Sequence, residues 1–535
     1  MTGRLQSLRL LMKARGLEVY AVPSSYPHQS EYVPDFWKRR QFLTGFTGSA
    51  GDALITLKEA GLWTDSRYFL QAERELRGSG FRLFKWGLPG VPSWQEWAAQ
   101  KLRRGETLGL DPQVITQKDY KKLEAELRKK GVKVRAVAKN LVDVIWPDRP
   151  AEPEGPIVIH GEKFAGESVE RKLGRLRRKM AEERAEAHVL SQLDAIAWLF
   201  NLRGSDAEFS PVAIAYAIVT LKGARLFVAA RKITPELKKA LGKTVRISAY
   251  KDFAGALRDL AQKGASVWLD EAEVSHWIVR RLRGARLIFK ESAVARFKAV
   301  KNKTEIVGAR RAQLRDGAAM VRFHFWLSKE VRRGGVTEVA AAKKLEEFRA
   351  REKNFRGLSF KTISAFAGHG AVVHYAVTPE TDIPLRPPGL YLFDSGSQYL
   401  EATTDSTRTI SLGRPTEEQR ELFTLTLKGL VALATISFPK GTSGPQLDVL
   451  ARRALWEKGL NYGHGTGHGI GAYLNVHEGP QGISPARGSG VGLEPGMILS
   501  NEPGFYKDGE FGIRIENMVL VVKDNGRSSG KSQFY

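Results

Sequence analysis

A short acidic, proline-rich stretch at residues 151–156 (AEPEGP) interrupts the chain, and it constrains the fold more than any other single feature. Stretches of this composition connect folded segments rather than forming part of one. A chain of 535 residues is also longer than one hydrophobic core usually supports. We therefore expect three domains, at residues 1–150, 157–300 and 301–535, with the last beginning at a helix start near Lys301.

The first two segments share a rhythm of helical and strand-like pieces that is typical of α/β domains and admits an internal duplication. At the N-terminus, leucines at helical spacing run into the strand-like Val19–Val22. A targeting peptide is the alternative there, but the sequence lacks its continuous apolar run and its small-residue cleavage site. In the second segment we expect strands at Val212–Thr220, Leu226–Ala229 and Ser266–Leu269, and helices near Val169–Arg184, at Pro235–Leu241 and at Phe253–Lys263.

The absence of cysteine narrows the chemistry, because it excludes disulfides, cysteine-based zinc sites and thiol catalysis. Any metal must then be held by His, Asp and Glu. No apolar run approaches the ~20 residues that cross a bilayer. We therefore expect no membrane association and a cytoplasmic location.

A formal net charge of +26 is typical of proteins that bind nucleic acid, so this function has to be considered. The basic residues are, however, spread along the chain, and the densest stretch, Arg171–Lys179, lies where Leu173, Leu176 and Met180 form one apolar helix face. No interleaved aromatic residues of the kind that stack bases accompany it. We therefore expect a solvated helix surface and no specific nucleic-acid partner, and the sequence gives no other account of the charge.

The third segment differs from the others in composition. A helix is expected to begin at Thr304, with Leu314, Ala318, Val321 and Phe325 at helical spacing. Beyond it, five of the ten histidines fall between residues 369 and 477, and glycine is dense from 463 to 504. Turn-rich sequence around a group of possible ligands predicts the active centre.

Two aspartates of this segment stand beside strand-like sequence. Tyr391-Leu-Phe-Asp394 is an apolar strand that ends in a carboxylate, and Asp405 follows eleven residues later in another β-prone stretch. Two neighbouring strands would bring the carboxylates together. Taken singly, an aspartate after a strand is more often a turn or helix cap.

Histidines and glycines are interleaved at Tyr462–Gly471 (YGHGTGHGIG), with His477 six residues further on. The glycines exclude a stable helix, so His464 and His468 are not a zinc-helix pair, and the run lacks the ending of a dinucleotide-binding loop. Glycine lets backbone pack closely against a metal or a peptide. A lone histidine is more often structural, but three within fourteen residues favour a site.

Two glutamates lie in apolar strand-like sequence near the end of the chain. Glu502 closes one strand, and Glu516 interrupts another, with Arg514 on the same face by two-residue alternation. A lone carboxylate in such a strand needs a partner, because its burial is costly. A metal ion is the natural partner of Glu516, whereas an ordinary cross-strand ion pair is the alternative for Arg514.

The candidate ligands are therefore four carboxylates and one imidazole, a set that suits two hard or borderline divalent ions such as Mn²⁺ or Co²⁺. They are Asp394, Asp405, His468, Glu502 and Glu516. The order and spacing of these residues resemble those of the pita-bread metallopeptidases, which include methionine aminopeptidase, prolidase and aminopeptidase P.

Further strings extend the resemblance over nearly the whole chain. Ala197–Asp206 (AWLFNLRGSD) is similar to the second domain of the long, three-domain, cytosolic type of aminopeptidase P. The first segment is similar to its first domain, through His28–Tyr32, Phe46–Gly51, Trp63–Gln71 and Asn140–Asp143. The resemblance implies an α/β (α+β) fold, with two creatinase-like N-terminal α/β domains followed by a pita-bread catalytic domain.

The resemblance also implies a reaction, the hydrolysis of the N-terminal Xaa-Pro bond of peptides by a hydroxide that bridges two divalent ions. The ion expected at both positions is Mn²⁺, with Co²⁺ or Zn²⁺ as alternatives. In this scheme Asp405 and Glu516 bridge the ions, Asp394 binds one, and His468 and Glu502 bind the other. Glu502 also accepts the proton of the nucleophile.

Four more residues receive roles from the same resemblance. His374 and His477 look like the family histidines that bind the scissile carbonyl or pass a proton to the leaving nitrogen, so both are candidate catalytic and substrate-binding residues. His464 resembles a residue that lines the proline pocket. In this scheme Arg514 is most simply a partner that orients the carboxylates. Proline preference has a physical basis, because an Xaa-Pro bond is a tertiary amide without an N–H.

Two features depart from the family pattern. The stretch Phe366–Gly370 contains His369, an unassigned histidine where the family has small or polar residues. The chain also ends at Tyr535, about where long members enter a last core strand and an extension that helps form a homodimer. We therefore expect a fragment, and the homodimer is not carried over to this chain.

Two other functions stay open beside the aminopeptidase. A prolidase-like dipeptidase would cleave Xaa-Pro dipeptides only. A catalytically inactive pita-bread module would bind other proteins instead, but such modules have lost their metal ligands, and all five candidates are present here.

Overall fold

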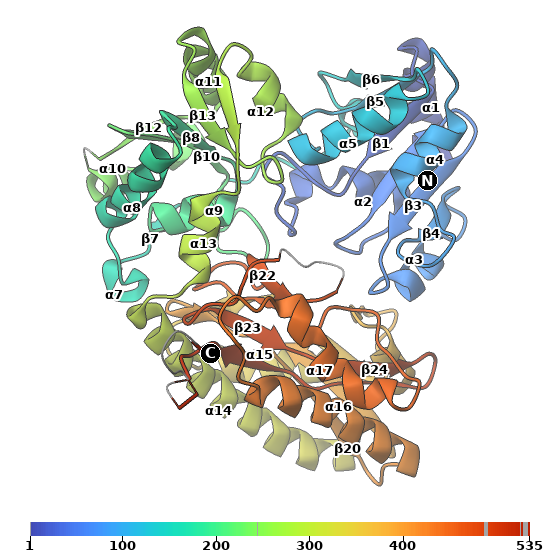
Figure 1. Cartoon of the computed structure of the whole chain (residues 1–535). Coiled ribbons are helices and arrows are strands. Elements are labelled where there is room, and N and C mark those ends of the chain that lie inside the picture. The colour runs from blue at the N-terminus through green and yellow to red at the C-terminus, as the bar shows by residue number, and fades with distance from the viewer. Residues whose placement is uncertain (1, 243, 486–489, 525, 528–532) are drawn as a thin grey trace. The chain divides into compact units, whose positions relative to one another are not determined.

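The computed structural model describes residues 2–242, 244–485, 490–524, 526–527 and 533–535 of the chain (Figure 1). The chain divides into two compact units. Unit 1 consists of Met1–Ile159, Ser168–Glu208 and Val212–Ala293, and unit 2 of His160–Glu167, Phe209–Pro211 and Val294–Tyr535.

Unit 1 contains two six-stranded sheets. The first has the order β4 (Arg82–Lys85), β3 (Ala60–Thr64), β2 (Asp52–Thr56), β1 (Val19–Val22), β5 (Thr107–Leu110) and β6 (Lys133–Ala136). The second has the order β12 (Val245–Ala249), β11 (Ala224–Val228), β10 (Ala215–Thr220), β8 (Ala187–Leu190), β13 (Ser266–Leu269) and β14 (Arg286–Phe289). A short pair is formed by β7 (Val158–Ile159) and β9 (Leu202–Arg203).

The two sheets have the same strand order and the same strand directions. In the first, β1 pairs antiparallel with β2 and parallel with β5, and in the second, β8 pairs antiparallel with β10 and parallel with β13. The outer strands repeat the match, since β3–β4 and β11–β12 are both parallel, as are β5–β6 and β13–β14. This correspondence supports an internal duplication.

The strand predicted at Val212–Thr220 is shorter in the structure and begins at Ala215. Val212 and Ile214, which the prediction included in the strand, are hydrogen-bonded to Asp206 rather than to a neighbouring strand. The backbone N–H of Ile214 donates to Asp206 Oδ2 (2.6 Å), and the N–H of Asp206 donates to the carbonyl of Val212. The predicted strands Val19–Val22 and Ser266–Leu269 match β1 and β13 residue for residue.

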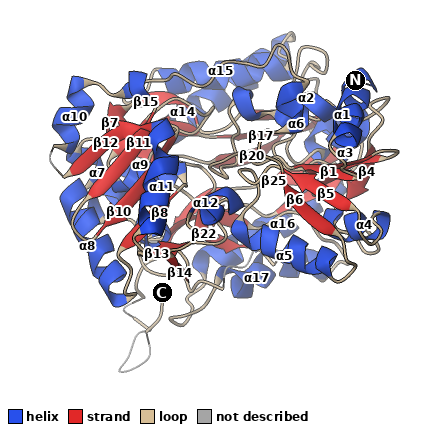
Figure 2. Cartoon of the chain, turned by 90° about the horizontal axis from the view of Figure 1, so that it is seen from above, coloured by secondary structure: helices blue, strands red, loops and turns tan. Residues whose placement is uncertain are grey.

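The helices of unit 1 begin where the sequence supplies caps, as at α4 (Trp94–Lys101), where Ser93 and Glu96 form a capping box. Figure 2 shows helices beside the strands of both sheets. In α8 (Val169–Glu182) the apolar face of Leu173, Leu176 and Met180 is fully buried, as expected. The remaining helices are α1 (Thr2–Ala14), α2 (Arg39–Thr44), α3 (Phe69–Glu75), α5 (Gln117–Arg128), α6 (Leu141–Val144), α9 (Leu193–Leu199), α10 (Pro235–Leu241), α11 (Phe253–Gln262) and α12 (His276–Arg281).

A buried histidine ties the two halves of unit 1 together. His28 has no exposed surface, and its Nδ1 donates to the carbonyl of Ser191 (2.9 Å). Its Nε2 is 2.9 Å from the hydroxyl of Tyr250 and accepts the hydroxyl proton, because a neutral imidazole carries a single N–H. Burial lowers the pKa of His28 to about 4, so the ring is neutral at pH 7.

The long continuous part of unit 2 begins with α13 (Ala293–Ala299, whose first residue belongs to unit 1) and α14 (Lys303–Arg333), capped by Asn302 and Glu305. The helix start agrees with the prediction to within one residue. The predicted apolar stripe faces solvent, however, since Leu314, Val321 and Phe325 are 76, 69 and 63% exposed.

The opposite face of α14 packs into the unit through both small and large apolar residues. Ala312, Ala319, Phe323 and Leu327 are completely buried there. Helical periodicity therefore identified the helix but not the side that faces the core. The other helices of unit 2 are α7 (Glu162–Ala165), α15 (Glu338–Ala350), the 3₁₀ helix η4 (Ala367–Ala371), α16 (Glu417–Thr435) and α17 (Gly444–Trp456).

Four small sheets make up the rest of unit 2. Two are three-stranded, one with the order β16 (Ile363–Phe366), β17 (Gly389–Ser395) and β20 (Ser406–Leu412), the other with β15 (Phe355–Leu358), β18 (Ser397–Tyr399) and β19 (Ala402–Thr403). The four-stranded sheet has the order β22 (Glu478–Ile483), β21 (Gly467–Gly469), β23 (Ile498–Asn501) and β26 (Asn517–Leu520), and the last is the hairpin of β24 (Gly504–Lys507) and β25 (Phe511–Arg514).

The described residues include no helix with the length and apolar character that crossing a membrane requires.

Candidate metal centre

The two predicted aspartates lie on adjacent antiparallel strands. Asp394 is in β17 and pairs with Thr407 of β20, and the next pair along is Ser395 with Ser406. Asp405 immediately precedes β20. Both carboxylates are buried. The two aspartates are thus carried by neighbouring strands, as expected, although β17 continues for one residue beyond Asp394 instead of ending there.

His468 and Glu502 are positioned by the four-stranded sheet. His468 is the middle residue of β21, and Glu502 follows directly after β23. Gly467 allows the close approach, because a Cβ there would lie 2.0 Å from the carbonyl oxygen of Ser500. The hydroxyl of Ser500 accepts from the N–H of His468 (3.0 Å) and donates to Glu502 Oε1 (3.1 Å), which joins the two candidate ligands.

Glu516 lies between β25 and β26 and is held by β20. The hydroxyl of Thr407 donates to Glu516 Oε2 (2.6 Å), and the backbone N–H of Glu516 donates to the carbonyl of Thr407 (3.1 Å). Thr409 does the same for Arg514, the last residue of β25, since its hydroxyl donates to the carbonyl of Arg514 and accepts from its N–H. Alternate residues of β20 thus fix both the predicted ligand and the predicted arginine.

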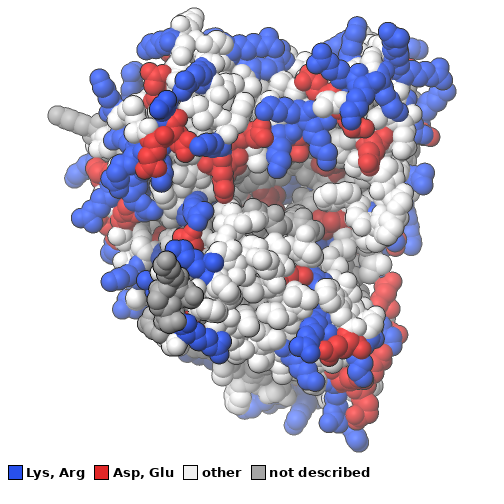
Figure 3. All heavy atoms as spheres, in the orientation of Figure 1, with Lys and Arg blue, Asp and Glu red and all other residues white. Residues whose placement is uncertain are grey.

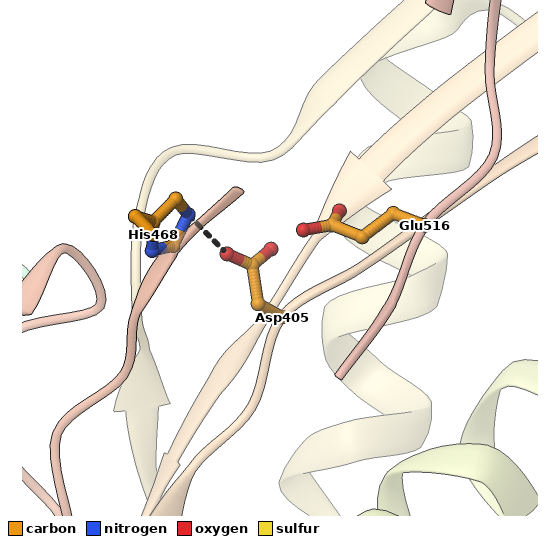
Figure 4. Close-up of side chains that lie close together, drawn as sticks. All are labelled: Asp405, His468 and Glu516. Carbon is orange, nitrogen blue, oxygen red and sulfur yellow. Dashed lines mark ion pairs between the residues drawn. The ribbon is translucent and has the colours of Figure 1, made fainter. Parts of the chain in front are cut away.

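Three of the five predicted ligands converge closely. Asp405, His468 and Glu516 each offer one ligand atom, and these atoms all lie within 4.8 Å of one another (Figure 4). His468 Nε2 is 3.4 Å from Asp405 Oδ2 and 3.5 Å from Glu502 Oε1, which places the fourth ligand beside them.

Burial raises the pKa of each of three carboxyls in this group, and their neighbours' negative charges raise it further. The pKa of Asp394 rises to about 6 through burial, against the opposing effect of Arg514, with Asp405 and Glu502 adding to the rise. The pKa values of Glu502 and Glu516 are raised for the same two reasons. Like charges gathered away from water favour the arrival of a compensating cation.

His468 responds in the opposite sense. Burial disfavours its charged form, but the hydrogen bond to Asp405 and the charges of Glu502 and Asp405 outweigh that effect and raise the pKa of His468 to about 9.

The donor set fits a pair of divalent ions. Asp394 Oδ1 is buried and has no hydrogen-bond partner among the described residues, while Asp394 Oδ2 accepts from Arg514 Nη2 (2.8 Å). A buried carboxylate oxygen with nothing to bind is costly unless a cation fills the place. Four carboxylates with one imidazole form an oxygen-rich set with a single borderline nitrogen donor.

A chain of hydrogen bonds connects this centre to His464. Arg514 donates to Asp394 through Nη2 and to the hydroxyl of Tyr506 through Nη1 (2.7 Å). The hydroxyl of Tyr506 lies 2.8 Å from His464 Nε2, whose other nitrogen, Nδ1, is 2.8 Å from the carbonyl of Gly465. Burial raises the pKa of Tyr506 to about 12, so the hydroxyl keeps its proton.

The other predicted histidines lie at the edge of the centre or outside it. The ring of His477 meets that of His468 edge-on, with centroids 4.4 Å apart. His374 is half-buried on the turn after η4, and η4 packs against β25. His369 is not among the grouped ligands; its Nδ1 lies 3.0 Å from the carboxylate of Glu338.

The sequence analysis missed several residues that hold the site. Thr407 and Ser500 were available from strand alternation, since each lies two residues from a predicted ligand and therefore on the same face. Tyr506 belongs to the same sequence motif as Glu502, but no pattern in the sequence indicates that it contacts the site. Glu338 lies far from the motifs in sequence and gave none.

Protein-family models match three successive parts of the chain. Residues 308–523 match metallopeptidase family M24, and residues 4–143 and 148–305 each match a creatinase/prolidase N-terminal domain. The fold is therefore two creatinase-like α/β domains followed by the pita-bread domain of this family, as predicted.

Individual proteins agree with the family models. A probable Xaa-Pro aminopeptidase P of Aspergillus fumigatus is 45% identical over 532 residues, which cover 97% of this chain and 81% of that protein. The crystal structure of X-prolyl aminopeptidase from Caenorhabditis elegans, described as a cytosolic enzyme with a di-nuclear active site, superposes with a TM-score of 0.96 at 35% identity and covers 100% of this chain and 89% of that one.

The dipeptidases are more distant. The Xaa-Pro dipeptidase from Bacillus anthracis has a TM-score of 0.56 at 24% identity and covers 66% of this chain and 95% of that one, a likeness of fold alone. The chain belongs to metallopeptidase family M24, among the aminopeptidase P proteins that carry two creatinase/prolidase N-terminal domains.

Proposed function

We propose that the chain removes the first residue from peptides whose second residue is proline, with the help of two divalent metal ions. The observation that carries the proposal is the buried group of carboxylates around His468, in which Asp394 keeps one oxygen unpartnered among the described residues. The relatives named Xaa-Pro aminopeptidase P support the substrate class. The Caenorhabditis structure supports two ions and a cytosolic location. Manganese as the ion is part of the proposal.

The ions would be held by the five predicted ligands. Asp405 and Glu516 would serve both, Asp394 would hold one, and His468 and Glu502 the other. When bound, the ions supply a water molecule of lowered pKa and withdraw electron density from the scissile carbonyl.

The chain's own residues then manage protons and orientation. Glu502, whose pKa burial already raises, accepts the proton of the attacking water. As the C–N bond to proline breaks, the leaving nitrogen takes up a proton, because an unprotonated amide anion is too basic to leave. His374 and His477 are the groups we assign to the carbonyl oxygen and to this proton transfer, and His477 lies against His468.

The preference for proline is assigned to His464. Its ring is fixed by Tyr506, which Arg514 in turn joins to Asp394. A rigid imidazole at this position can pack against the pyrrolidine ring while the metal ligands stay in place.

The test is hydrolysis of three peptides by the purified full chain after loading with Mn²⁺. We expect release of the first residue from Xaa-Pro-Pro peptides and none from the matched Xaa-Ala-Pro peptides. Cleavage of Xaa-Pro dipeptides with no cleavage of longer peptides would favour a prolidase-like dipeptidase. Intact Xaa-Pro peptides with two bound ions would leave a binding module as the better description.

Glu502→Gln provides the internal control for the chemistry. The substitution keeps the size of the side chain but removes the base, so kcat should fall by at least about 100-fold. Circular dichroism should be unchanged. Normal turnover in this variant would mean that the base is a different residue.

A further inference from the structure

A second buried carboxylate lies outside the metal ligands and has no role in the mechanism above. Glu338 is the first residue of α15 and its side chain is completely buried. Its carboxylate accepts hydrogen bonds from the backbone N–H of Phe366 (2.6 Å), from His369 Nδ1 (3.0 Å) and from the hydroxyl of Tyr375 (3.1 Å). Its place in the first turn of a helix adds a favourable dipole.

No lysine or arginine pairs with Glu338 among the described residues, and His369 is the single basic group in contact with it. The carboxylate therefore depends on these three donors, since a buried carboxylate that loses them would be costly. The carboxylate in turn fixes the positions of the three groups that donate to it.

All three donors come from one ten-residue segment. Phe366 ends β16, His369 lies within η4, and Tyr375 follows His374 directly. The rings of His369 and Tyr375 stack, with centroids 4.5 Å apart and planes 28° apart. One carboxylate thus fastens the segment at its start, its middle and its end, and the end is the residue next to His374.

The other side of the segment is pressed against a strand of the metal centre. A Cβ on Gly512 of β25 would lie 1.8 Å from the carbonyl oxygen of Gly370, and a Cβ on Gly370 would lie 2.9 Å from the nitrogen of Gly512. β25 leads to Arg514 and Glu516. The segment therefore has little freedom to move relative to the metal ligands as long as Glu338 holds it.

We infer that Glu338 is a positioning residue for His374, and that His369 and Tyr375 are the two side chains through which it acts. The inference rests on the catalytic role proposed for His374. It gives a function to His369, which the motif analysis leaves unassigned. The alternative is that Glu338 merely stabilises α15.

The experiment is a double-mutant cycle with Glu338→Gln and His374→Ala in the Mn²⁺-loaded full chain. Glutamine keeps the size but cannot accept all three hydrogen bonds, so His374 should shift and kcat should fall about tenfold with KM changed less than about twofold. The double variant should be no slower than His374→Ala alone, because a residue that acts through His374 has nothing left to position. A purely structural role predicts that the two losses multiply.

Hydrogen–deuterium exchange of the metal-free protein supplies a readout that does not involve activity. Glu338→Gln should speed exchange in peptides spanning residues 366–375, including the Phe366 amide that donates to the carboxylate, and leave residues 511–514 unchanged. Glu305→Gln is the matched control. It alters another buried glutamate in the first turn of a helix of the same unit, one that accepts from the N–H of Asn302, and kcat should stay at the wild-type value.

The outcomes separate this inference from the proposed function. Wild-type kcat in His374→Ala would overturn the role of His374 and the inference with it. A slow His374→Ala combined with multiplicative losses, or with wild-type kcat in Glu338→Gln, would overturn the inference alone. If Glu338→Gln does not fold, Tyr375→Phe removes one of the three hydrogen bonds while keeping the ring stack, and it must show the same dependence on His374.

Discussion

Asp394 combines two opposing influences. Arg514 favours its charged form, whereas burial and the charges of Asp405 and Glu502 disfavour it, and the net effect raises its pKa to about 6. A carboxyl whose folded pKa lies above its unfolded value binds more protons in the folded state between those two values. The contribution of Asp394 to the stability of the metal-free protein therefore falls as the pH rises from about 4 to about 6.

This reasoning gives a prediction for Asp394→Asn. Asparagine stays neutral at every pH. As the pH rises from 4 to 7, the free energy of unfolding of the metal-free variant should therefore increase relative to that of the metal-free wild type by on the order of 3 kcal/mol, with a relative rise in Tm of several degrees. Thermal unfolding in EDTA measures it. Asp508→Asn, at an exposed aspartate, should show no such trend. If Tm depends on pH in the same way in wild type and in Asp394→Asn, the pKa of Asp394 is not raised in the metal-free site.

The ligand residues were predictable because their chemistry is local to short motifs. A carboxylate that ends or interrupts an apolar strand, such as Glu502 or Glu516, is conspicuous in sequence. Glu338 was not, because its meaning depends on donors that lie 28–37 residues away and meet it only in the folded chain. Three-dimensional contacts of this kind leave no periodic signal.

At the scale of elements, η4 lies so close to β25 that Gly512 has no room for a side chain. Gly512→Ala places a methyl group 1.8 Å from the carbonyl oxygen of Gly370, so one element must move. Overpacking of this kind typically costs about 1–3 kcal/mol. We expect a lower Tm and a loss of kcat larger than the loss of metal binding, because the segment that carries His374 moves while Asp405, next to β20, and Glu502, next to β23, stay.

Gly317→Ala is the matched control for that substitution. Gly317 is an exposed position of α14 where a Cβ would meet nothing within 4 Å, so alanine should be neutral or slightly stabilising. Measurement of Tm, kcat and bound metal in both variants decides the matter. Equal activity of the two variants would mean that the backbone absorbs the extra methyl group without moving His374.

In α14 the sequence predicts the helix but not the side of it that faces the core. The apolar stripe through Leu314 and Phe325 marks a helix correctly, but the side that packs is the one bearing Ala312 and Ala319. The packing side also carries Phe323 and Leu327, so both sides of the helix are apolar in sequence. The orientation of a helix with apolar residues on two faces therefore depends on its neighbours in the fold.

For the whole molecule, the net charge of +26 remains without a partner that would explain it. Figure 3 shows Lys and Arg in several groups on the face drawn, with Asp and Glu between them. Self-repulsion of this size should lower stability at low ionic strength. We predict that Tm rises by about 2–5 °C between 10 and 150 mM NaCl and then levels off, because the screening length falls to about 8 Å.

KCl should reproduce that rise at equal ionic strength. A flat or falling Tm would mean that the excess of 26 positive charges is spaced widely enough for its self-repulsion to cost little stability.

The division of the chain at 1–150, 157–300 and 301–535 stays a proposal about sequence segments, and the structure adds a different grouping. His28 donates a hydrogen bond to the carbonyl of Ser191 and accepts one from the hydroxyl of Tyr250, so each half of unit 1 completes the hydrogen bonding of the other. Separated halves would each leave polar groups of this core unsatisfied. The duplicated domains should therefore melt together as one cooperative body, and the gene segment that can be swapped or expressed by itself is the pair rather than the single copy.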